Sequence, residues 1–250
     1  GSHNTTAHPT KPYVYNSDSD LASTGAGKIE IWSIKNPAKP TKVGEFTNGV
    51  HSPHDISFNS DGTMAVTAGI SAWQLLDTSD PEAPSLSFVS QCPGCSITHD
   101  AKFTPDDQGI VIGDEGGGGG GYPCPGGALY FYDFSSGAVP VLQGVYEPGE
   151  FVVARDGQTS PGACTSHVFD FDDKGEHISI SWYSAGTRYL DITNPVGPTV
   201  GSNGVGIVEA GWFMPDGGSS WSSKIYKDPK YIFSNDINRG FDVFKITAKG

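Results

Sequence analysis

Cations are scarce in this sequence: 15 Lys and Arg residues stand against 28 Asp and Glu residues, for a formal net charge of −13. No cluster of Lys and Arg occurs anywhere along the chain. Proteins that bind nucleic acids or anionic membranes need basic patches, so the sequence disfavours both kinds of partner. Apolar runs are also short, and none approaches the length of a membrane span, so we expect no membrane insertion.

A helical periodicity is missing as well, because apolar residues alternate with polar ones instead of recurring at intervals of three and four. Glycine and proline are abundant, at 34 and 18 of the 250 residues, which is typical of short strands joined by tight turns. The sequence therefore predicts an all-β protein. Its length is sufficient for one large all-β domain or for two small ones.

Only four cysteines are present. Cys92 and Cys95 flank a Pro-Gly turn in a CxxC motif, whereas Cys124 and Cys164 stand alone. We expect disulfides between Cys92 and Cys95 and between Cys124 and Cys164, with a redox-active CxxC or half of a zinc site as alternatives for the first pair. Two disulfides are typical of an oxidising compartment, so we expect a secreted, cell-surface or periplasmic protein.

The chain contains repeats, each with three or four predicted strands of about five residues. Turn motifs of the Asp-Gly kind, at 59–62 and 172–175, predict hairpins between the first two strands of a repeat. Repeat lengths of about 45 to 68 residues match propeller blades better than solenoid coils. We therefore predict a single β-propeller domain over residues 1–250, with five blades or as an incomplete part of a larger propeller. The predicted blades are residues 3–50, 51–96, 97–163, 164–210 and 211–250.

The third strand of several repeats ends in a turn that contains Asn-Pro or Asp-Pro, at 34–40, 77–84 and 191–198, and we expect its Asp residues to cap the turn. The pattern Leu-Asp-Ile-Thr-Asn-Pro at 190–195 resembles the LVIVD-repeat proteins, a group of bacterial β-propellers. Segments 3–9, 164–169 and 234–243 resemble that group most closely. The resemblance implies a propeller fold and export, and it implies no defined activity.

One histidine recurs in the same local context of successive repeats. His54, His99 and His167 each precede a phenylalanine by four residues, and His3 falls in the same register. The first strand of a propeller blade lines the central channel, so we expect these imidazoles to converge at one mouth of it. Neutral imidazole binds first-row transition metals, and the sequence therefore predicts a metal site that holds Cu, Fe or Zn.

Two alternatives remain open for these histidines. Gly1-Ser2-His3 resembles in part a cloning remnant, although its register with the later repeats favours a native His3. A structural histidine that satisfies backbone groups of the channel, copied with each repeat, is the alternative to a metal site. In the fifth repeat, alignment of Tyr226 with the phenylalanines puts Ser222 at the histidine position.

Charged residues at other strand ends are candidates for catalysis. Asp114, Glu115 and Asp236 end predicted second strands, and Arg239 lies at a similar place. Such carboxylates orient histidine ligands or act as general bases, and an arginine binds an anionic ligand, with solvated loop ends as the alternative. The glycine run at 116–121 after Glu115 predicts a flexible flap.

These features predict an exported β-propeller metalloprotein, with a metal-dependent oxidative enzyme as its catalytic form. One alternative is a non-catalytic secreted or cell-surface scaffold for a glycan or a protein, which would use Trp212, Phe213 and Trp221 as exposed loop aromatics. The other is a metal-free enzyme that uses the channel histidines as acid and base. The sequence leaves open whether the protein is an enzyme, which small molecule or glycan it binds, and how it oligomerises.

Overall fold

The computed structural model describes residues 2–18, 27–47, 52–119, 126–148, 163–193, 207–226 and 230–247. Within these residues the secondary structure consists of 19 strands and a single 3-10 helix, η1 (Gly116–Gly119). This helix occupies the described part of the glycine run for which the sequence predicts a flap. No helix in the described ranges has the length and apolar character that a membrane crossing requires.

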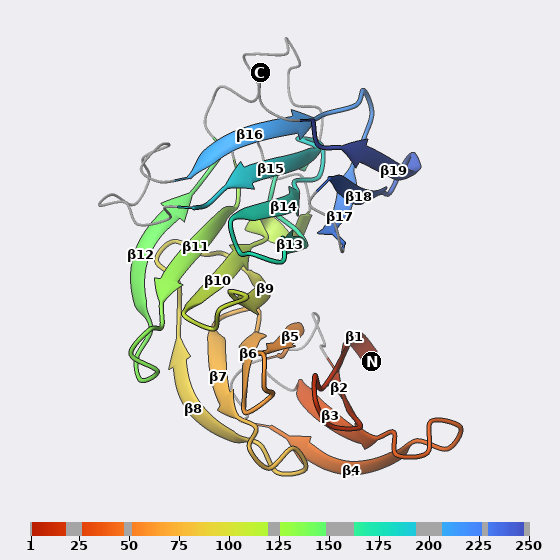
Figure 1. Cartoon of the computed structure of the whole chain (residues 1–250), viewed down its shortest axis with the longest axis vertical. Coiled ribbons are helices and arrows are strands. Elements are labelled where there is room, and N and C mark those ends of the chain that lie inside the picture. The colour runs from red at the N-terminus through yellow and green to blue at the C-terminus, as the bar shows by residue number, and fades with distance from the viewer. Residues whose placement is uncertain are drawn as a thin grey trace. The chain divides into compact units, whose positions relative to one another are not determined.

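The strands form five sheets, in which strands that follow one another along the chain lie side by side (Figure 1). The first sheet contains β1 (Ser2–Ala7), β2 (Tyr13–Asp18), β3 (Lys28–Ser33) and β4 (Thr41–Phe46). The second contains β5 (Asp55–Phe58), β6 (Met64–Ala68), β7 (Trp73–Asp77) and β8 (Ser85–Ser90). The third contains β9 (Thr98–Phe103), β10 (Gly109–Asp114), β11 (Ala128–Asp133) and β12 (Val141–Tyr146).

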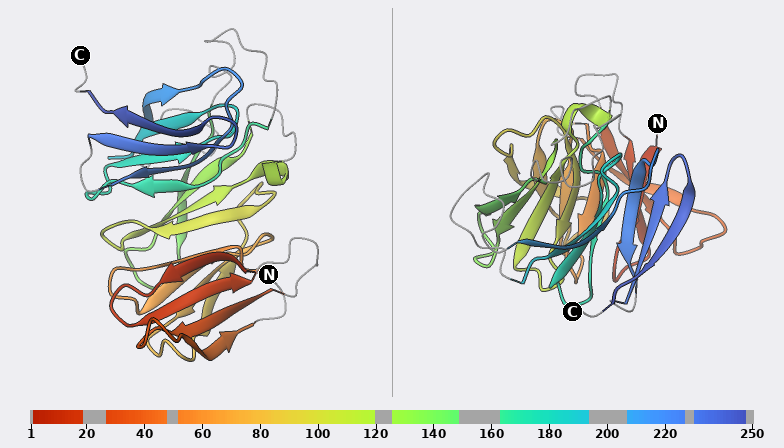
Figure 2. Two further views of the ribbon diagram at one scale, coloured as in Figure 1. Left: turned by 90° about the vertical axis from the view of Figure 1, so that its right-hand side faces the viewer. Right: turned by 90° about the horizontal axis from the view of Figure 1, so that it is seen from above.

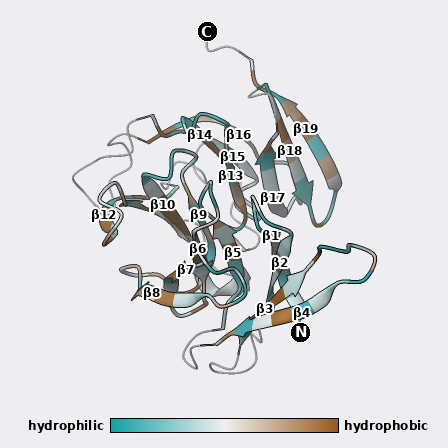
Figure 3. Cartoon of the chain, turned by 60° about the horizontal axis from the view of Figure 1, so that its bottom comes forward, coloured by the Kyte–Doolittle hydropathy of each residue, from teal (hydrophilic) through white to brown (hydrophobic). Residues whose placement is uncertain are grey.

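The fourth sheet contains β13 (Phe169–Phe171), β14 (His177–Ser181), β15 (Thr187–Asp191) and β16 (Val208–Phe213). The fifth contains β17 (Ser220–Ile225), β18 (Tyr231–Asp236) and β19 (Gly240–Lys245), and no fourth strand pairs with β19 among the described residues. Apolar and polar segments succeed one another along β19 (Figure 3), where Phe241 and Val243 are 61% and 52% exposed. β16 runs to Phe213, three residues beyond the predicted end of the fourth blade at 210.

The same irregularity recurs in the four-stranded sheets: the pairing of the third strand with the fourth shifts near the middle of the third strand. The shift lies at Ile31/Trp32, Leu75/Leu76, Phe131/Tyr132 and Tyr189/Leu190. A bulge bends a strand and increases its twist, so its recurrence gives successive sheets the same curvature. Figure 2 shows the twist of the first sheet, in red and orange. The repeats that the sequence predicts are therefore copies of one structural unit.

Internal contacts divide the chain into two compact units. Unit 1 is Gly1–Ile112 with Phe134–Val139, and unit 2 is Gly113–Asp133 with Pro140–Gly250. The first two sheets belong to unit 1, the last two belong to unit 2, and the boundary falls within β10.

The core is formed by side chains that alternate along the strands with outward-facing residues. In unit 1, Tyr13, Tyr15, Ile29 and Ile31 are at most 7% exposed, while the residues between them face outward. They pack with Ile56 and neighbouring side chains of the second sheet. Burial of one such side chain stabilises the fold by about 1.5–3 kcal/mol, so this one cluster fixes the two sheets against each other.

The turns behave as their residues predict. β5 pairs with β6 and β13 with β14 as antiparallel hairpins, and Gly62 and Gly175 adopt φ angles of 77° and 69° in their turns. Only glycine adopts such angles without strain. The predicted caps are confirmed too, because Asp77 accepts a hydrogen bond from the Ser79 amide at 2.9 Å and Asp191 accepts one from the Thr193 amide at 3.1 Å.

The Cys92–Cys95 disulfide is present, with 5.4 Å between the two Cα atoms. Cys164 is also disulfide-bonded. Its predicted partner, Cys124, lies outside the described residues.

Candidate functional site

Three of the four predicted ligand histidines lie together in unit 1. His3 belongs to β1, His54 directly precedes β5 and His99 is the second residue of β9, so each stands at the start of the first strand of its sheet. The His54 amide donates to the Ala68 carbonyl at 2.7 Å, which extends the β5–β6 pairing by one residue and holds the histidine in place. The repeated strand start therefore brings together residues that are separated by about half of unit 1 in sequence.

The imidazole rings of these residues are neighbours. Ring centres lie 3.6 Å apart for His3 and His54 and 4.4 Å apart for His54 and His99, with interplanar angles of 37° and 57°. His54 and His99 are 3% and 4% exposed, whereas His3 lies at the surface. Desolvation lowers the pKa of His3, against the opposing effect of a hydrogen bond with the His54 backbone. Desolvation thus favours the neutral form of His3, which is the form that binds metals.

The ring separations can be compared with those of a metal centre. A metal bound to nitrogen at about 2.0–2.1 Å lies about 3.2 Å from the ring centre, so two rings at a right angle around it are about 4.5 Å apart. The His54–His99 ring centres, 4.4 Å apart, are close to this spacing. The His3–His54 separation of 3.6 Å is shorter, so His3 must move outward by about 1 Å to share an ion. As a surface residue, His3 has room for that movement.

Two buried carboxyl groups follow two of the histidines in sequence. Asp55 accepts hydrogen bonds from the Asn4 side chain at 2.5 Å and from the Ile56 amide at 2.7 Å. Asp100 forms an ion pair with Lys102 at 2.6 Å. Burial, followed by the nearby charge of Asp100, raises the pKa of Asp55 to about 8. Asp55 is therefore mainly protonated at neutral pH.

Asp55 and Asp100 are not among the site residues expected from the sequence, although a His-Asp dipeptide at both 54–55 and 99–100 marks them. Their importance comes from burial, because they are 8% and 0% exposed. A buried carboxyl group of this kind orients neighbouring groups and compensates positive charge.

The fourth predicted histidine, His167, belongs to unit 2. Its amide donates to the Ser181 carbonyl at 2.9 Å, the equivalent of the His54–Ala68 bond. Its Nδ1 lies 2.5 Å from the Trp221 carbonyl oxygen, and its Nε2 lies 3.9 Å from Glu115 Oε1. A carbonyl accepts only from N–H, so Nδ1 carries a proton, while Nε2 lies toward Glu115.

Glu115 also accepts a hydrogen bond from the Tyr183 hydroxyl. Burial raises the pKa of Glu115, and the hydrogen bond from Tyr183 opposes that rise. Burial and the Glu115 contact likewise raise the pKa of Tyr183. Tyr183 adopts a φ angle of 42°, which is rare outside glycine and clusters at functional sites, and Ile70 of unit 1 adopts a similar angle of 63°. A histidine, a carboxylate and a phenol are thus held together in a buried place.

The strand pairing corrects the register of the fifth repeat. Phe58 pairs with Ala65 and Ile225 pairs with Ile232, each seven residues along the chain, so Ile225 and not Tyr226 matches the phenylalanine position. The residue four positions earlier is therefore Trp221 instead of Ser222. Trp221 sits at the bulge in β17, and its ring centre is 3.9 Å from that of His167.

The aromatic residues expected on loops lie on strands instead. Trp212 and Phe213 belong to β16 and Trp221 belongs to β17, and they are 39%, 38% and 42% exposed. Their exposure agrees with the expectation, and their location does not.

The remaining candidates have structural contacts. The carbonyl of buried Asp114 accepts hydrogen bonds from the hydroxyls of Thr165 and Ser166, at 3.2 and 2.5 Å. The carboxylate of Asp236 accepts from the amides of Ser219 at 2.9 Å and Arg239 at 3.0 Å.

Arg239 forms an ion pair with Asp242 at 2.7 Å, within the β18–β19 hairpin. Among the described contacts, none joins Asp236 or Arg239 to His167. The two residues therefore stabilise a turn, and their proposed catalytic roles stay predictions.

A second group of possible metal ligands, in unit 2, was not expected from the sequence. Ligand atoms of Asp172, Glu176 and His177 lie within 4.8 Å of one another at the β13–β14 turn. His177 Nδ1 lies 2.8 Å from Asp172 Oδ2, and the Asp172 carboxylate also accepts from the Glu176 amide at 2.8 Å. These bonds close the hairpin, so a structural role accounts for the group.

Solved structures share the fold of this chain. A protein from Lactobacillus plantarum matches 96% of this chain and 66% of its own length, with 17% identity and a TM-score of 0.65. The hydrazine synthase of Kuenenia stuttgartiensis matches 95% of this chain and 69% of its own, with 11% identity and a TM-score of 0.64. The β-propeller domain of Cps50 (Swd1) from Myceliophteria thermophila matches 94% and 67%, with 8% identity and a TM-score of 0.60.

The chain thus spans about two thirds of the solved structures that it matches. At these identities the similarity defines the fold alone, and the predicted all-β propeller is confirmed, with five sheets as its blades. No family profile and no curated protein sequence matches the chain.

Proposed function

We propose that this β-propeller protein binds a transition metal ion through the histidines that begin its blades, with His3, His54 and His99 as the ligands in unit 1. One observation carries the proposal: three imidazoles from three separate strand starts lie with neighbouring ring centres 3.6 and 4.4 Å apart. Imidazole ligands suit Cu, Fe and Zn, and burial of two of the three keeps competing water away.

His167 is the fourth ligand predicted from the sequence, and its environment in unit 2 supports a ligand role. Metal-binding histidines commonly donate their second N–H to a backbone carbonyl, which fixes the tautomer. His167 Nδ1 has that relation to the Trp221 carbonyl, at 2.5 Å. Glu115 Oε1, 3.9 Å from His167 Nε2, would supply a carboxylate ligand or a base.

The wider function follows from this centre. A metal with an open position supplies an activated water or dioxygen, so the protein would be an exported, metal-dependent oxidative enzyme. The Cys92–Cys95 disulfide supports export, because structural disulfides persist in oxidising compartments. Membership of the LVIVD-repeat group is part of the same proposal. A metal-free scaffold and a metal-free acid–base enzyme are the alternatives.

Elemental analysis tests the proposal. Protein prepared without an affinity tag is loaded with Cu²⁺ or Zn²⁺, desalted and analysed for bound metal per chain. We expect one tightly bound ion per chain, with a dissociation constant raised at least 100-fold by His54→Ala or His99→Ala.

His8→Gln is the matched control, because His8 is a buried histidine of unit 1 that packs against Phe58 with 5.0 Å between ring centres. Circular dichroism confirms that each variant is folded. Metal binding equal in wild type, His54→Ala and His99→Ala would overturn the proposal. His167→Ala tests the fourth predicted ligand: loss of bound metal supports a ligand role for His167, and unchanged metal binding removes it from the ligand set.

A further inference from the structure

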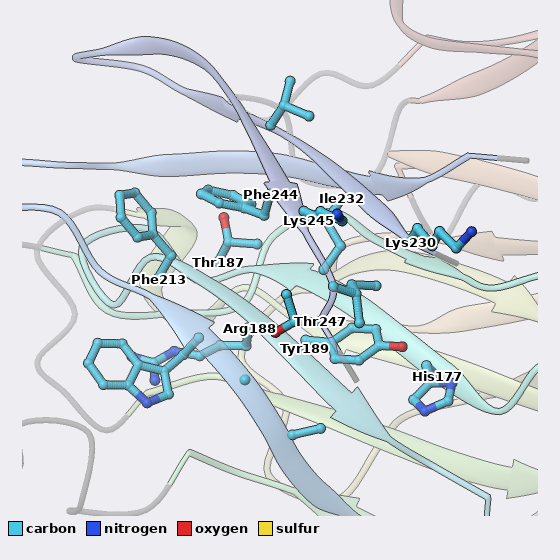
Figure 4. A pocket seen from close by; sticks show the side chains of 15 residues that line it. His177, Thr187, Arg188, Tyr189, Phe213, Lys230, Ile232, Phe244, Lys245 and Thr247 are labelled. Carbon is cyan, nitrogen blue, oxygen red and sulfur yellow. The ribbon is translucent and has the colours of Figure 1, made fainter. Parts of the chain in front are cut away.

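A cavity of about 720 Å³ opens in unit 2, within the size range of small-molecule sites. Residues of β15 and β16 in the fourth sheet form one wall, and residues of β18 and β19 in the fifth sheet form the other (Figure 4). None of the predicted metal ligands lines it, so it is a separate feature of the molecule.

The interior of the cavity is mainly aromatic and aliphatic. Phe213 and Phe244 lie at one end, with 4.8 Å between their ring centres, and Tyr189 lies farther along (Figure 4). Tyr189 stacks on His177 at 4.9 Å with an interplanar angle of 8°, and Ile232 forms part of the floor. Flat rings of this kind favour a flat aromatic guest, because offset-stacked and edge-to-face contacts add to simple burial.

The charge of the lining is opposite to that of the chain. Acidic residues outnumber Lys and Arg by 28 to 15 in the sequence, yet no acidic residue lines the cavity in the described part of the chain. The lining residues that carry or acquire positive charge are His177, Arg188, Lys230 and Lys245. A hydrophobic space with only basic groups at its walls is complementary to an amphipathic anion.

Two of these groups already have anionic partners. Arg188 is fully buried, forms an ion pair with Glu209 at 3.3 Å and lies over the Trp212 ring at 5.6 Å. His177 contacts Asp172. Lys230 also takes part in a contact, whereas no ion pair or side-chain hydrogen bond among the described residues involves the ammonium group of Lys245. Lys245 is therefore the cation best placed to bind the acidic group of a ligand.

We propose that this cavity binds a small aromatic anion, such as an aromatic carboxylate or sulfonate, with its ring among Tyr189, Phe213 and Phe244 and its acidic group at Lys245. Binding of this ligand needs no metal, so it does not depend on whether the histidines bind an ion.

The dye 1-anilinonaphthalene-8-sulfonate is the probe, because it is an aromatic sulfonate whose fluorescence rises in an apolar site. N-phenyl-1-naphthylamine is its uncharged control, with the same aromatic body and no acid. Titration of the full chain, followed by fluorescence and calorimetry, should show one sulfonate dye per chain, bound about 10-fold more tightly than the neutral dye.

Lys245→Gln tests the role of charge. The Coulomb energy of one close ion pair in water corresponds to about a five-fold change in affinity, so this variant should weaken the sulfonate dye about five-fold and leave the neutral dye unchanged. Lys224→Gln, an exposed lysine of β17 that does not line the cavity, is the matched control and should change neither dye.

Gly211→Leu tests the location. A Cβ atom at Gly211 would find Tyr189 Cβ at 4.0 Å as its nearest neighbour, so a larger side chain enters the cavity without a clash. We expect this variant to keep its melting temperature and to lose both dyes. Sulfonate binding that survives both Gly211→Leu and Lys245→Gln would overturn the proposal, as would equal affinity for the charged and neutral dyes.

Discussion

Replacement of Asp55 by Asn should change how the stability of the apo protein depends on pH. Asp55 is buried beside Asp100, and burial above all raises its folded-state pKa to about 8, against an ordinary value of 3.8. Between these values the folded chain holds a proton that the unfolded chain releases. The free energy of unfolding of the wild type therefore falls as pH rises from about 4 to about 8 because of this group.

The size of this change in the free energy of unfolding follows from the raised pKa of Asp55. One proton corresponds to about 1.4 kcal/mol per pH unit, so Asp55 alone lowers the free energy of unfolding by about 3 kcal/mol between pH 5 and pH 7. Asn has the size of Asp and still accepts from the Ile56 amide, but it does not titrate. The stability of Asp55→Asn relative to the wild type should therefore rise by about that amount over this interval.

Urea denaturation in the presence of a chelator measures this difference at half-unit steps of pH. Desolvation lowers the pKa of His3 and of His8, but both histidines are common to the two proteins, so their contributions cancel in the difference. Asp77→Asn is the control, because a hydrogen bond from the Ser79 amide holds the pKa of Asp77 below its usual range, and its effect should be constant from pH 5 to 7. Parallel stability curves for wild type and Asp55→Asn would contradict a raised pKa of Asp55 in the folded state.

Three further predictions concern stability. Gly186→Ala should lower the free energy of unfolding by at least about 2 kcal/mol more than Gly137→Ala does, as measured by urea denaturation. Both glycines have positive φ, but a Cβ at Gly186 would lie 2.0 Å from the Phe213 carbonyl oxygen, whereas a Cβ at Gly137 meets nothing within 4 Å. Trp182→Ala should lower the free energy of unfolding by about 3–5 kcal/mol, since this fully buried ring also donates a hydrogen bond to the Gly126 carbonyl at 2.7 Å. Trp182→Phe keeps an aromatic ring in place and should lower the free energy of unfolding clearly less. Zn²⁺ at 100 times its dissociation constant should raise the free energy of unfolding by about 2.7 kcal/mol in the wild type and much less in His54→Ala, and equal effects in calorimetry would contradict metal binding at that residue.

The sequence was sufficient to predict the repeats of the fold, because period-two alternation and Asp-Gly turns are local features. Hairpin turns with Gly62 and Gly175 have the predicted conformation. The alignment of the repeats also identified His3, His54 and His99. These residues are neighbours in unit 1 because each lies at the start of the first strand of its sheet.

The alignment of the fifth repeat with the earlier repeats was wrong by one residue. An aromatic residue anchored the alignment in the earlier repeats, but Tyr226 is 61% exposed beyond the end of β17, and buried Ile225 takes the anchoring position. A bulge at Trp221 is set by the geometry of the sheet and has no marker in the sequence.

The burial of individual polar residues and the presence of cavities could not be predicted from sequence patterns. Asp55 resembles any strand-initiating acid in the sequence, and only its burial beside Asp100 raises its pKa. The cavity between the fourth and fifth sheets depends on how β16 and β19 pack, and its basic lining is assembled from lysines that are 15 residues apart. Such features need tertiary contacts.

X-ray absorption spectroscopy of the metal-loaded chain reports the ligands of the ion itself, so it tests whether histidines bind the metal. A histidine centre should give nitrogen neighbours at about 2.0–2.1 Å and the multiple-scattering pattern of at least three imidazoles, reduced by one in His99→Ala. A shell of oxygen atoms without imidazole scattering, unchanged in that variant, would contradict it.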